Sequence, residues 1–142
     1  MRLRLSDGGR NDAGFRGRGG DCVTRAIAIA TGTPYLRVRN ALTEMIKEAT
    51  GGIVRGVANG CLTPVAHTYL VAMGWEAVPT PTAFYLNELP TDGRFIACMT
   101  TRRHWAAIID DTVVDAWDCR KTPRTKTGWM KLEGYYQKSK SN

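Results

Sequence analysis

The stretch "GDCVTRAIAIATG" (residues 20–32) decides how the rest of the chain must be arranged. Cys22 follows Asp21 directly and stands ahead of a run of helix formers that one threonine and one arginine interrupt. A helix that is apolar on nearly every side is buried, so this segment is predicted to be the central helix of the domain, ending at Thr31-Gly32. Asp21 is expected at the N-cap of this helix or in its first turn.

The length and composition indicate one globular domain spanning residues 1–142, with 43% hydrophobic residues. No apolar run approaches transmembrane length, and the first residues lack the apolar core of a signal peptide, so a cytoplasmic protein with no membrane partner is expected. The four cysteines show neither Cys-x-x-Cys spacing nor a dense framework, which predicts reduced thiols. With two histidines in the chain, we expect no metal site and no cofactor.

Positive charge is concentrated at the two ends of the chain. The net charge is +5 over residues 1–40, −4 over 41–118 and +6 over 119–142. Such ends either attract nucleic acid or an acidic protein, or form only a solubilising surface. The arginines lack the interleaved aromatic residues that are typical of RNA-recognition modules.

Helices are predicted in the first half of the chain, after a glycine-rich lead-in loop over residues 1–20. This loop has no Gly-Lys-Ser/Thr ending and does not follow a strand, which argues against a phosphate-binding loop. A second helix is predicted from Thr33-Pro34 to about Ala49, and a third from Thr63-Pro64 to Gly74, since both begin with an N-cap residue and a proline.

The hydrophobic period then changes from helical to strand-like. Residues 82–90 are predicted to form one or two helical turns. Short apolar runs typical of strands occur at 75–79, 94–100, 104–109, 112–117 and 128–137. Helices followed by strands predict an α+β fold with a small antiparallel sheet. A basic loop over 119–128 and a flexible tail over 138–142 complete the expected organisation.

Cys22 is a candidate nucleophile because of its place at the start of the buried helix. The unpaired N–H groups and the positive end of the helix dipole stabilise a thiolate there, and the same groups can hold an oxyanion. A thiolate of this kind is usually paired with a histidine. His67 lies in the middle of a helix and is expected to be partly exposed there. His104 opens a strand and is either a surface residue or the partner of Cys22.

A two-residue turn at Asp110-Asp111 would fix the register of the strands around His104. Ile109 then pairs with Thr112, and continuing the ladder places His104 opposite Trp117. Aspartate is a weaker residue than glycine for such a turn, because both central positions need a positive φ.

With this register, strand alternation places Asp115 on the same face as His104, diagonal to it. A carboxylate there would fix the tautomer of the imidazole and support the imidazolium, and Trp117 would shield the hydrogen bond from water. Asp118 falls on the opposite face. One extra loop residue or a bulge would reverse this parity, which makes Asp118 the alternative third member of the site.

The order of cysteine at a helix start, histidine at a strand start and aspartate on the partner strand resembles the papain-like cysteine hydrolases. "DAW" (115–117) resembles the Asn-Ser-Trp segment of that superfamily, with aspartate in place of asparagine, as in bacteriocin-processing peptidases and transglutaminase-like relatives. More closely, "GDCVTRAIAIATGTPY" (20–35) and "RHWAAIIDDTVVDAWDC" (103–119) resemble a family of small bacterial and phage proteins of unassigned function. The resemblance implies a papain-like fold with the nucleophile on the central helix.

The resemblance also implies an oxyanion-hole glutamine about six residues before the cysteine, where this chain has Arg16. Arg16, Arg18 or Asn11 would then donate instead, or only backbone N–H groups serve. The candidates for oxyanion or substrate contacts are Asn11, Arg16, Asp21, Trp105 and Trp117.

Three functional hypotheses follow. The first is a cysteine-dependent hydrolase or acyl transferase (peptidase, isopeptidase, amidase or deamidase) acting on a peptide or protein amide, with Cys22 as nucleophile, His104 as acid and base, and Asp115 orienting His104. The second is a non-catalytic papain-like binding module, for example a phage-encoded one, that contacts nucleic acid or an acidic host protein through its basic ends. The third is a structural protein in which Cys22 is a core residue.

Overall fold

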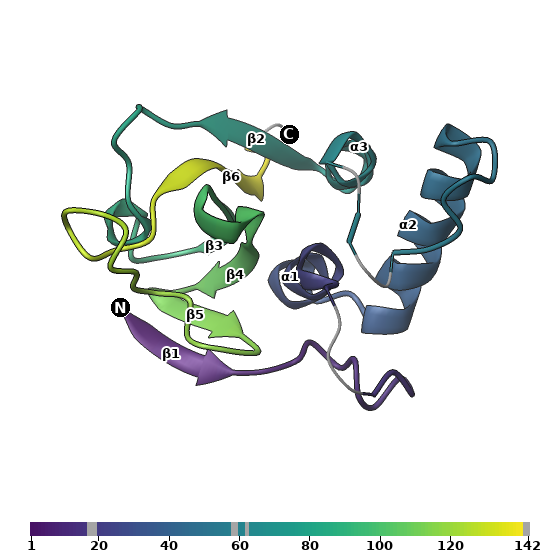
Figure 1. The fold of residues 1–142 in the computed structure, drawn as a ribbon, viewed down its shortest axis with the longest axis horizontal. Helices are drawn as coiled ribbons and strands as arrows, with labels where there is room; N and C mark the ends of the chain where they lie inside the picture. Colours follow the sequence, from purple (N-terminus) through teal and green to yellow (C-terminus); the bar gives the residue numbers. More distant parts are fainter. Residues whose placement is uncertain (17–19, 58–59, 62, 141–142) are drawn as a thin grey trace.

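The computed structural model describes residues 1–16, 20–57, 60–61 and 63–140. Its three α-helices are α1 (Cys22–Thr31), α2 (Tyr35–Ala49) and α3 (Thr63–Ala72). Its strands are β1 (Arg2–Leu5), β2 (Trp75–Pro79), β3 (Arg94–Met99), β4 (Trp105–Ile109), β5 (Thr112–Asp115) and β6 (Leu132–Lys138), and two short 3-10 turns are η1 (Leu86–Glu88) and η2 (Thr101–Arg103). The fold is therefore α+β, as predicted (Figure 1). No helix within the described ranges combines the length and the apolar character that crossing a membrane requires.

The strands form one mixed sheet in the order β1-β5-β4-β3-β6-β2. The prediction of an antiparallel sheet is wrong at one edge, because β1 pairs with β5 in parallel. The prediction of a loop over the whole of residues 1–20 is wrong at the same place. This strand could not be predicted from the local sequence, because Arg2–Leu5 is only four residues long and its partner strand lies more than a hundred residues further along the chain.

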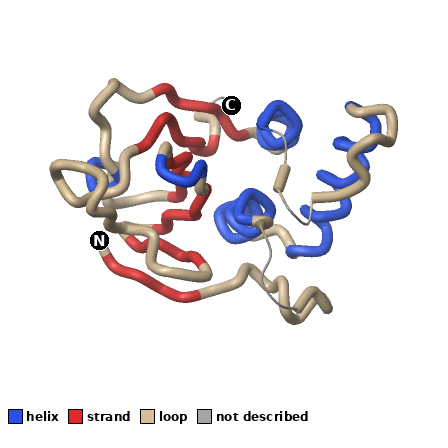
Figure 2. The backbone as a smooth tube through the Cα atoms, viewed as in Figure 1, coloured by secondary structure: helices blue, strands red, loops and turns tan. Residues whose placement is uncertain are grey.

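The helices cover one side of the sheet, as Figure 2 shows. The core on this side joins the three helices to the sheet through residues such as Ile27, Val38 and Ala107. The opposite side of the sheet packs against η1 and the segment after β5, where Leu86 and Cys119 are fully buried. The sheet therefore separates two apolar clusters, and His104 directly precedes β4, a strand that packs against α1.

The helix boundaries follow the signals in the sequence. Gly32 ends α1 in the left-handed conformation (φ 72°), which glycine adopts at little cost. Pro34 occupies the N-cap position of α2, so this helix begins one residue later than predicted. One face of α2 is buried, where Val38, Leu42 and Ile46 pack into the core.

The hairpin between β4 and β5 has the predicted register. Ile109 pairs with Thr112, and both turn residues have positive φ, 46° at Asp110 and 58° at Asp111. Aspartate tolerates this conformation better than most residues. The Asp110 carboxylate also accepts a hydrogen bond from the Gly93 N–H (2.9 Å), which anchors the turn.

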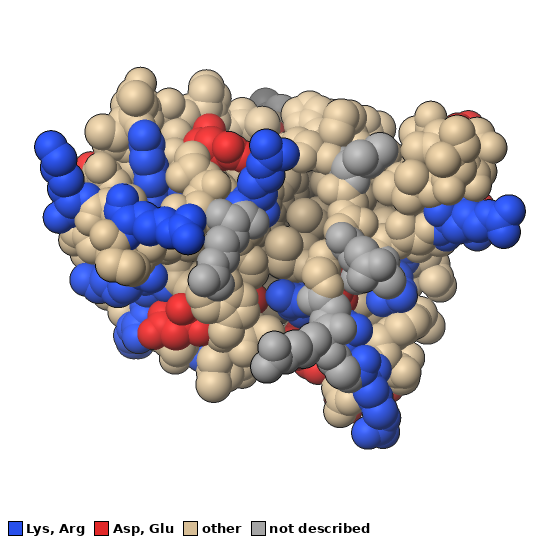
Figure 3. Space-filling model, viewed as in Figure 1, with Lys and Arg blue, Asp and Glu red and all other residues tan. Residues whose placement is uncertain are grey.

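Both basic ends of the chain contribute a strand to the sheet, β1 and β6. The predicted tail over 138–142 is wrong at its start, because Lys138 lies in β6 and the Ser139 N–H donates to the Gly74 carbonyl at 2.7 Å. Residues 141–142 lie outside the described residues. In the basic loop, a bridge pairs Lys121 with Trp129, and the Lys121 ammonium lies 3.8 Å from the centre of the indole. On the face in Figure 3, Lys and Arg side chains are scattered over both halves of the molecule.

Candidate active site

Cys22 is the first residue of α1 and is half-buried. Asp21 occupies the N-cap position, as expected, but its side chain makes no capping hydrogen bond. The first turn of α1 contains no acidic residue. Because the N–H groups of a first turn have no partner within the helix, the thiol lies at a site that favours negative charge.

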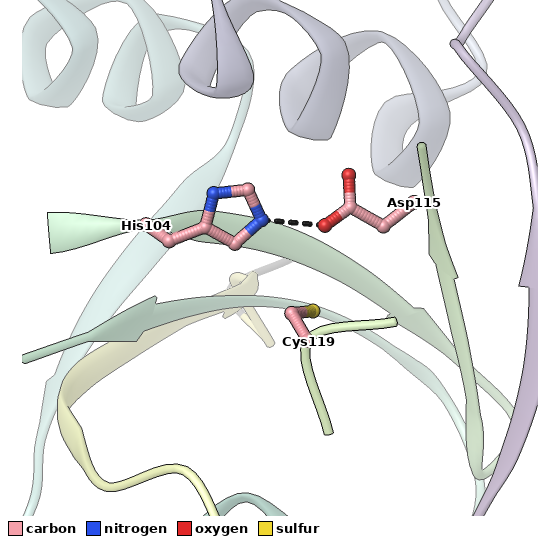
Figure 4. A group of neighbouring side chains, drawn as sticks. All are labelled: His104, Asp115 and Cys119. Carbon is pink, nitrogen blue, oxygen red and sulfur yellow. Dashed lines mark hydrogen bonds and ion pairs between the residues drawn. The ribbon is translucent and has the colours of Figure 1, made fainter. Parts of the chain in front are cut away.

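His104 and Asp115 form a buried pair beside this helix start. His104 directly precedes β4 and is 6% exposed, and Asp115 is the last residue of β5 and is 3% exposed. The Nε2 atom of His104 lies 2.5 Å from Oδ2 of Asp115, and the ring edge with the other nitrogen faces α1 (Figure 4). The second Asp115 oxygen accepts a hydrogen bond from the Ala116 N–H (2.7 Å). The carboxylate is thus held between its own backbone and the imidazole.

Trp117 and Asp118 occupy the places that the hairpin register predicts. The Trp117 ring lies 4.8 Å from the His104 ring, at 49° between the planes, and Trp117 is exposed whereas His104 is buried. Asp118 is exposed, and its carboxylate binds Arg120 at 2.9 Å. The structure therefore brings Asp115, and not Asp118, to His104.

The electrostatics of the site favour a charged Cys22. Burial opposes ionisation of the thiol, but hydrogen bonds from His104 and from the Trp105 N–H, together with the charges of His104 and Arg25, lower the Cys22 pKa below its ordinary value. Burial likewise opposes the charged form of His104. Its hydrogen bonds with Asp115, Cys119 and Cys22 outweigh that effect and raise the His104 pKa. Both shifts act in the direction that favours a thiolate beside an imidazolium.

The other three thiols have the opposite character. Burial raises the pKa of Cys61 to about 11, and burial also raises the pKa values of Cys98 and Cys119. Cys22 is therefore the one cysteine of the four whose surroundings favour the thiolate.

Arg25 is a member of the site that the sequence analysis missed. The buried Asp21 carboxylate binds Arg10 (Nε–Oδ2 3.0 Å), Arg25 and the Tyr35 hydroxyl. Arg25 also lies 3.9 Å from the Asp115 carboxylate. The guanidinium thus stands between two buried carboxylates, and Asp21 anchors it there. The signal was present, since Asp21 and Arg25 are four residues apart on one helix face.

The remaining candidates lie in different places. Asn11 and Arg16 are exposed, and no hydrogen bond or ion pair among the described residues joins them to Cys22. Arg18 lies outside the described residues. Trp105 approaches Cys22 through its backbone N–H, while its indole packs against Tyr136 at 5.5 Å between ring centres. His67 is exposed on α3, and its Nδ1 atom lies 2.9 Å from the Tyr136 hydroxyl.

His104, Asp115 and Cys119 also offer ligand atoms that lie within 4.8 Å of one another (Figure 4). Ligands of a tetrahedral zinc ion stand about 3.3 Å apart, given bonds of about 2.0 Å. At 2.5 Å, the His104–Asp115 contact is too short to hold an ion, and Cys119 is fully buried beneath it. The cluster fits a hydrogen-bonded acid–base pair with a neighbouring thiol better than it fits a metal.

The site joins elements that lie far apart in sequence: the start of α1, the residue before β4 and the end of β5. The resemblance to papain-like hydrolases rests on short motifs within these elements and stays a prediction. Comparison of the chain with protein-family models, with curated proteins and with solved structures found no match.

Proposed function

We propose that this protein is a papain-like, cysteine-dependent amide hydrolase or acyl transferase with the triad Cys22, His104 and Asp115. The observation that carries the proposal is the buried His104–Asp115 hydrogen bond beside a thiol that begins a buried helix. A cysteine that only fills the core needs neither a histidine nor an aspartate beside it, whereas a nucleophilic cysteine of this kind uses both.

The proposed reaction begins with attack of the Cys22 thiolate on the carbonyl carbon of an amide. A carbon–sulfur bond forms and the carbonyl oxygen becomes an oxyanion. His104 then gives its Nδ1 proton to the leaving nitrogen as the carbon–nitrogen bond breaks, which leaves a thioester on Cys22. Water, or another acceptor in an acyl transferase, loses a proton to His104 as it attacks the thioester. The carbon–sulfur bond then breaks, and the acyl group leaves bonded to the water oxygen or to the acceptor. The thiolate–imidazolium pair is restored.

Each of the other groups has a role in this scheme. Asp115 binds Nε2, so Nδ1 is the nitrogen that exchanges protons with substrate. Asn11 and Arg16 are exposed and, among the described residues, make no hydrogen bond with Cys22, so we assign the oxyanion to N–H groups in the first turn of α1. Removal of a single oxyanion donor typically costs about a hundredfold in rate or more, so these groups matter even without a side-chain donor.

An activated ester tests the proposal without knowledge of the natural substrate. p-Nitrophenyl acetate should acetylate Cys22 with release of p-nitrophenolate in a burst, followed by slower turnover as water cleaves the thioester. Cys22→Ala and His104→Ala should abolish the burst, and Cys61→Ala, which removes a thiol of raised pKa, should retain it. A burst that survives in Cys22→Ala, or an acetyl group found on another residue, would contradict the proposed nucleophile.

A further inference from the structure

A groove of about 420 Å³ lies on the helix-covered side of the sheet, next to the start of α3. Val78 and Pro79 of β2 form one wall, Trp105 and Tyr136 contribute aromatic surface, and Glu133 and Gly134 belong to its β6 side. The volume is within the range of pockets that hold small ligands. The lining is apolar apart from the Glu133 carboxylate and a few backbone and hydroxyl groups.

A β-bulge positions Glu133. Cys98 of β3 pairs with Gly134, whereas its neighbour Met99 pairs with Leu132, so Glu133 is the extra residue on β6. Leu132 and Met99 belong to the apolar cluster on the side of the sheet away from the helices, and Cys98 belongs to the other. The bulge therefore releases Glu133 from the regular alternation, and its exposed side chain borders the groove.

Gly134 keeps the groove open. A Cβ atom at this position would lie 3.4 Å from the Val78 carbonyl oxygen, which is ordinary contact, but a longer side chain would extend into the groove. The rings of Trp105 and Tyr136 stand 5.5 Å apart at an angle of 43°, and both residues are more than nine-tenths buried. Both side chains are held rigidly, and the small part of each that lines the groove is suited to contact with a hydrocarbon stem.

The groove is connected to the proposed nucleophile through Trp105. The indole of Trp105 lines the groove, and its backbone N–H hydrogen-bonds to the Cys22 thiol. Cys98, which pairs with Trp105 across the sheet, also lines the groove and feels the charges of both Glu133 and Cys22. A substrate bound at Cys22 would therefore have a side chain within reach of the groove.

Glu133 is unusual in its surroundings. It is the one acidic residue among seven basic residues in the segment 119–142. Within the described residues, no lysine or arginine forms an ion pair with it. Its charge is thus available to a ligand, although the chain as a whole carries a net charge of +7.

We propose that this groove is a specificity site that takes a lysine or arginine side chain of the substrate. The aliphatic stem lies against Trp105 and Tyr136, and the cationic group meets the Glu133 carboxylate. The inference rests on the proposed function, because it assigns the substrate class of the same site.

Dipeptidyl chloromethyl ketones with lysine, norleucine or glutamate at either position provide the test. The Cys22 thiolate displaces chloride from the probe, forming a thioether and releasing chloride ion. The rate of Cys22 labelling by each probe is divided by the rate with iodoacetamide, measured on the same variant. The wild-type protein should prefer lysine over norleucine by about fivefold at one of the two positions, and should disfavour glutamate there, as expected for one solvent-accessible charge pair.

Two variants test whether the preference for lysine comes from the Glu133 carboxylate or from the net charge of the protein. Glu133→Gln should remove the preference for lysine over norleucine. Glu44→Gln removes the same charge from the exposed surface of α2 and should leave the preference intact. Gly134→Leu should slow all the peptide probes relative to iodoacetamide, whereas Gly134→Ala, whose Cβ the backbone accommodates, should leave their rates unchanged.

The outcomes distinguish this inference from the proposed function. Equal labelling by the lysine, norleucine and glutamate probes, with Cys22 reactive toward iodoacetamide, overturns the groove assignment and leaves the nucleophile standing. A lysine preference that persists in Glu133→Gln overturns the role of Glu133. A Cys22 that reacts with neither iodoacetamide nor any peptide probe overturns the proposed function and the groove assignment together.

Discussion

The reactivity of Cys22 is the property on which the proposed mechanism depends most directly. A brief pulse of iodoacetamide at pH 7 is expected to alkylate Cys22 before the other three cysteines. The half-buried Cys61 is the informative comparison, because Cys98 and Cys119 are also protected by burial.

The expected difference can be worked out from the pKa values. The pKa of Cys61 is about 11, so about one molecule in ten thousand carries its thiolate at pH 7. An unperturbed thiol is ionised at roughly the one-percent level, and the Cys22 pKa is lowered from there, which gives at least a hundredfold advantage in thiolate. The more basic thiolate is intrinsically more nucleophilic, by about tenfold over about two pKa units. Cys22 should therefore react at least about tenfold faster than Cys61.

The assay is a light-label pulse followed by unfolding, a heavy-label chase and mass mapping of the four peptides from pH 5 to pH 10. His104→Asn should move the midpoint of the Cys22 rate profile to higher pH, since a cation that favours the thiolate is lost. His67→Asn is the matched control, because His67 contacts Tyr136 and not Cys22. Equal labelling of Cys22 and Cys61, or a profile that His104→Asn leaves in place, would refute the thiolate–imidazolium pair.

Asp115→Ala should lower the rate of ester turnover by about a hundredfold or more, whereas Asp118→Ala should turn over the ester at nearly the wild-type rate. Stopped assays on the two purified variants measure both rates. The reverse result would mean that the wrong carboxylate has been assigned. Cys22→Ala should abolish turnover yet cost less than about 2 kcal/mol in urea unfolding, because the side chain is only half-buried; a larger loss would favour a core role. Arg25→Met should lower the free energy of unfolding by about 3–5 kcal/mol, because it leaves the Asp21 and Asp115 carboxylates buried with fewer partners. Arg37→Met, at an exposed position, is the control and should change stability little. Equal urea midpoints for the two variants would contradict the network.

The hairpin shows what could be predicted from the sequence. With Asp110 and Asp111 as a two-residue turn, strand alternation alone predicts that His104 lies opposite Trp117 and diagonal to Asp115. The structure has the same register at Ile109–Thr112 and the same ring contact between His104 and Trp117. The inference worked because short-range turn chemistry fixes the parity of every residue on the two strands.

Features that depend on contacts between distant segments were not predictable in the same way. The bulge that places Glu133 exists only in the pairing of β3 with β6, and neither strand alone indicates it. The role of Arg25 required knowledge that Asp115 lies against α1, although its pairing with Asp21 follows helical spacing. In the sequence, Arg25 appeared as an interruption of an apolar run, whereas in the structure it is 7% exposed between two carboxylates.

Residues 1–10 link the strand that carries Asp115 to the helix that begins with Cys22. β1 runs beside β5, and the Ser6 N–H that follows it donates to the Asp115 carbonyl at 2.8 Å, which fixes the backbone of the proposed orienting residue. Gly8 then packs against α1: a Cβ there would lie 3.3 Å from the Arg25 carbonyl oxygen, and φ is +71°, so glycine is favoured on both grounds. Arg10 reaches the Asp21 carboxylate directly before Cys22. The first ten residues, predicted as part of a glycine-rich loop, therefore contact both the backbone of Asp115 and the start of α1, which carry two members of the proposed triad.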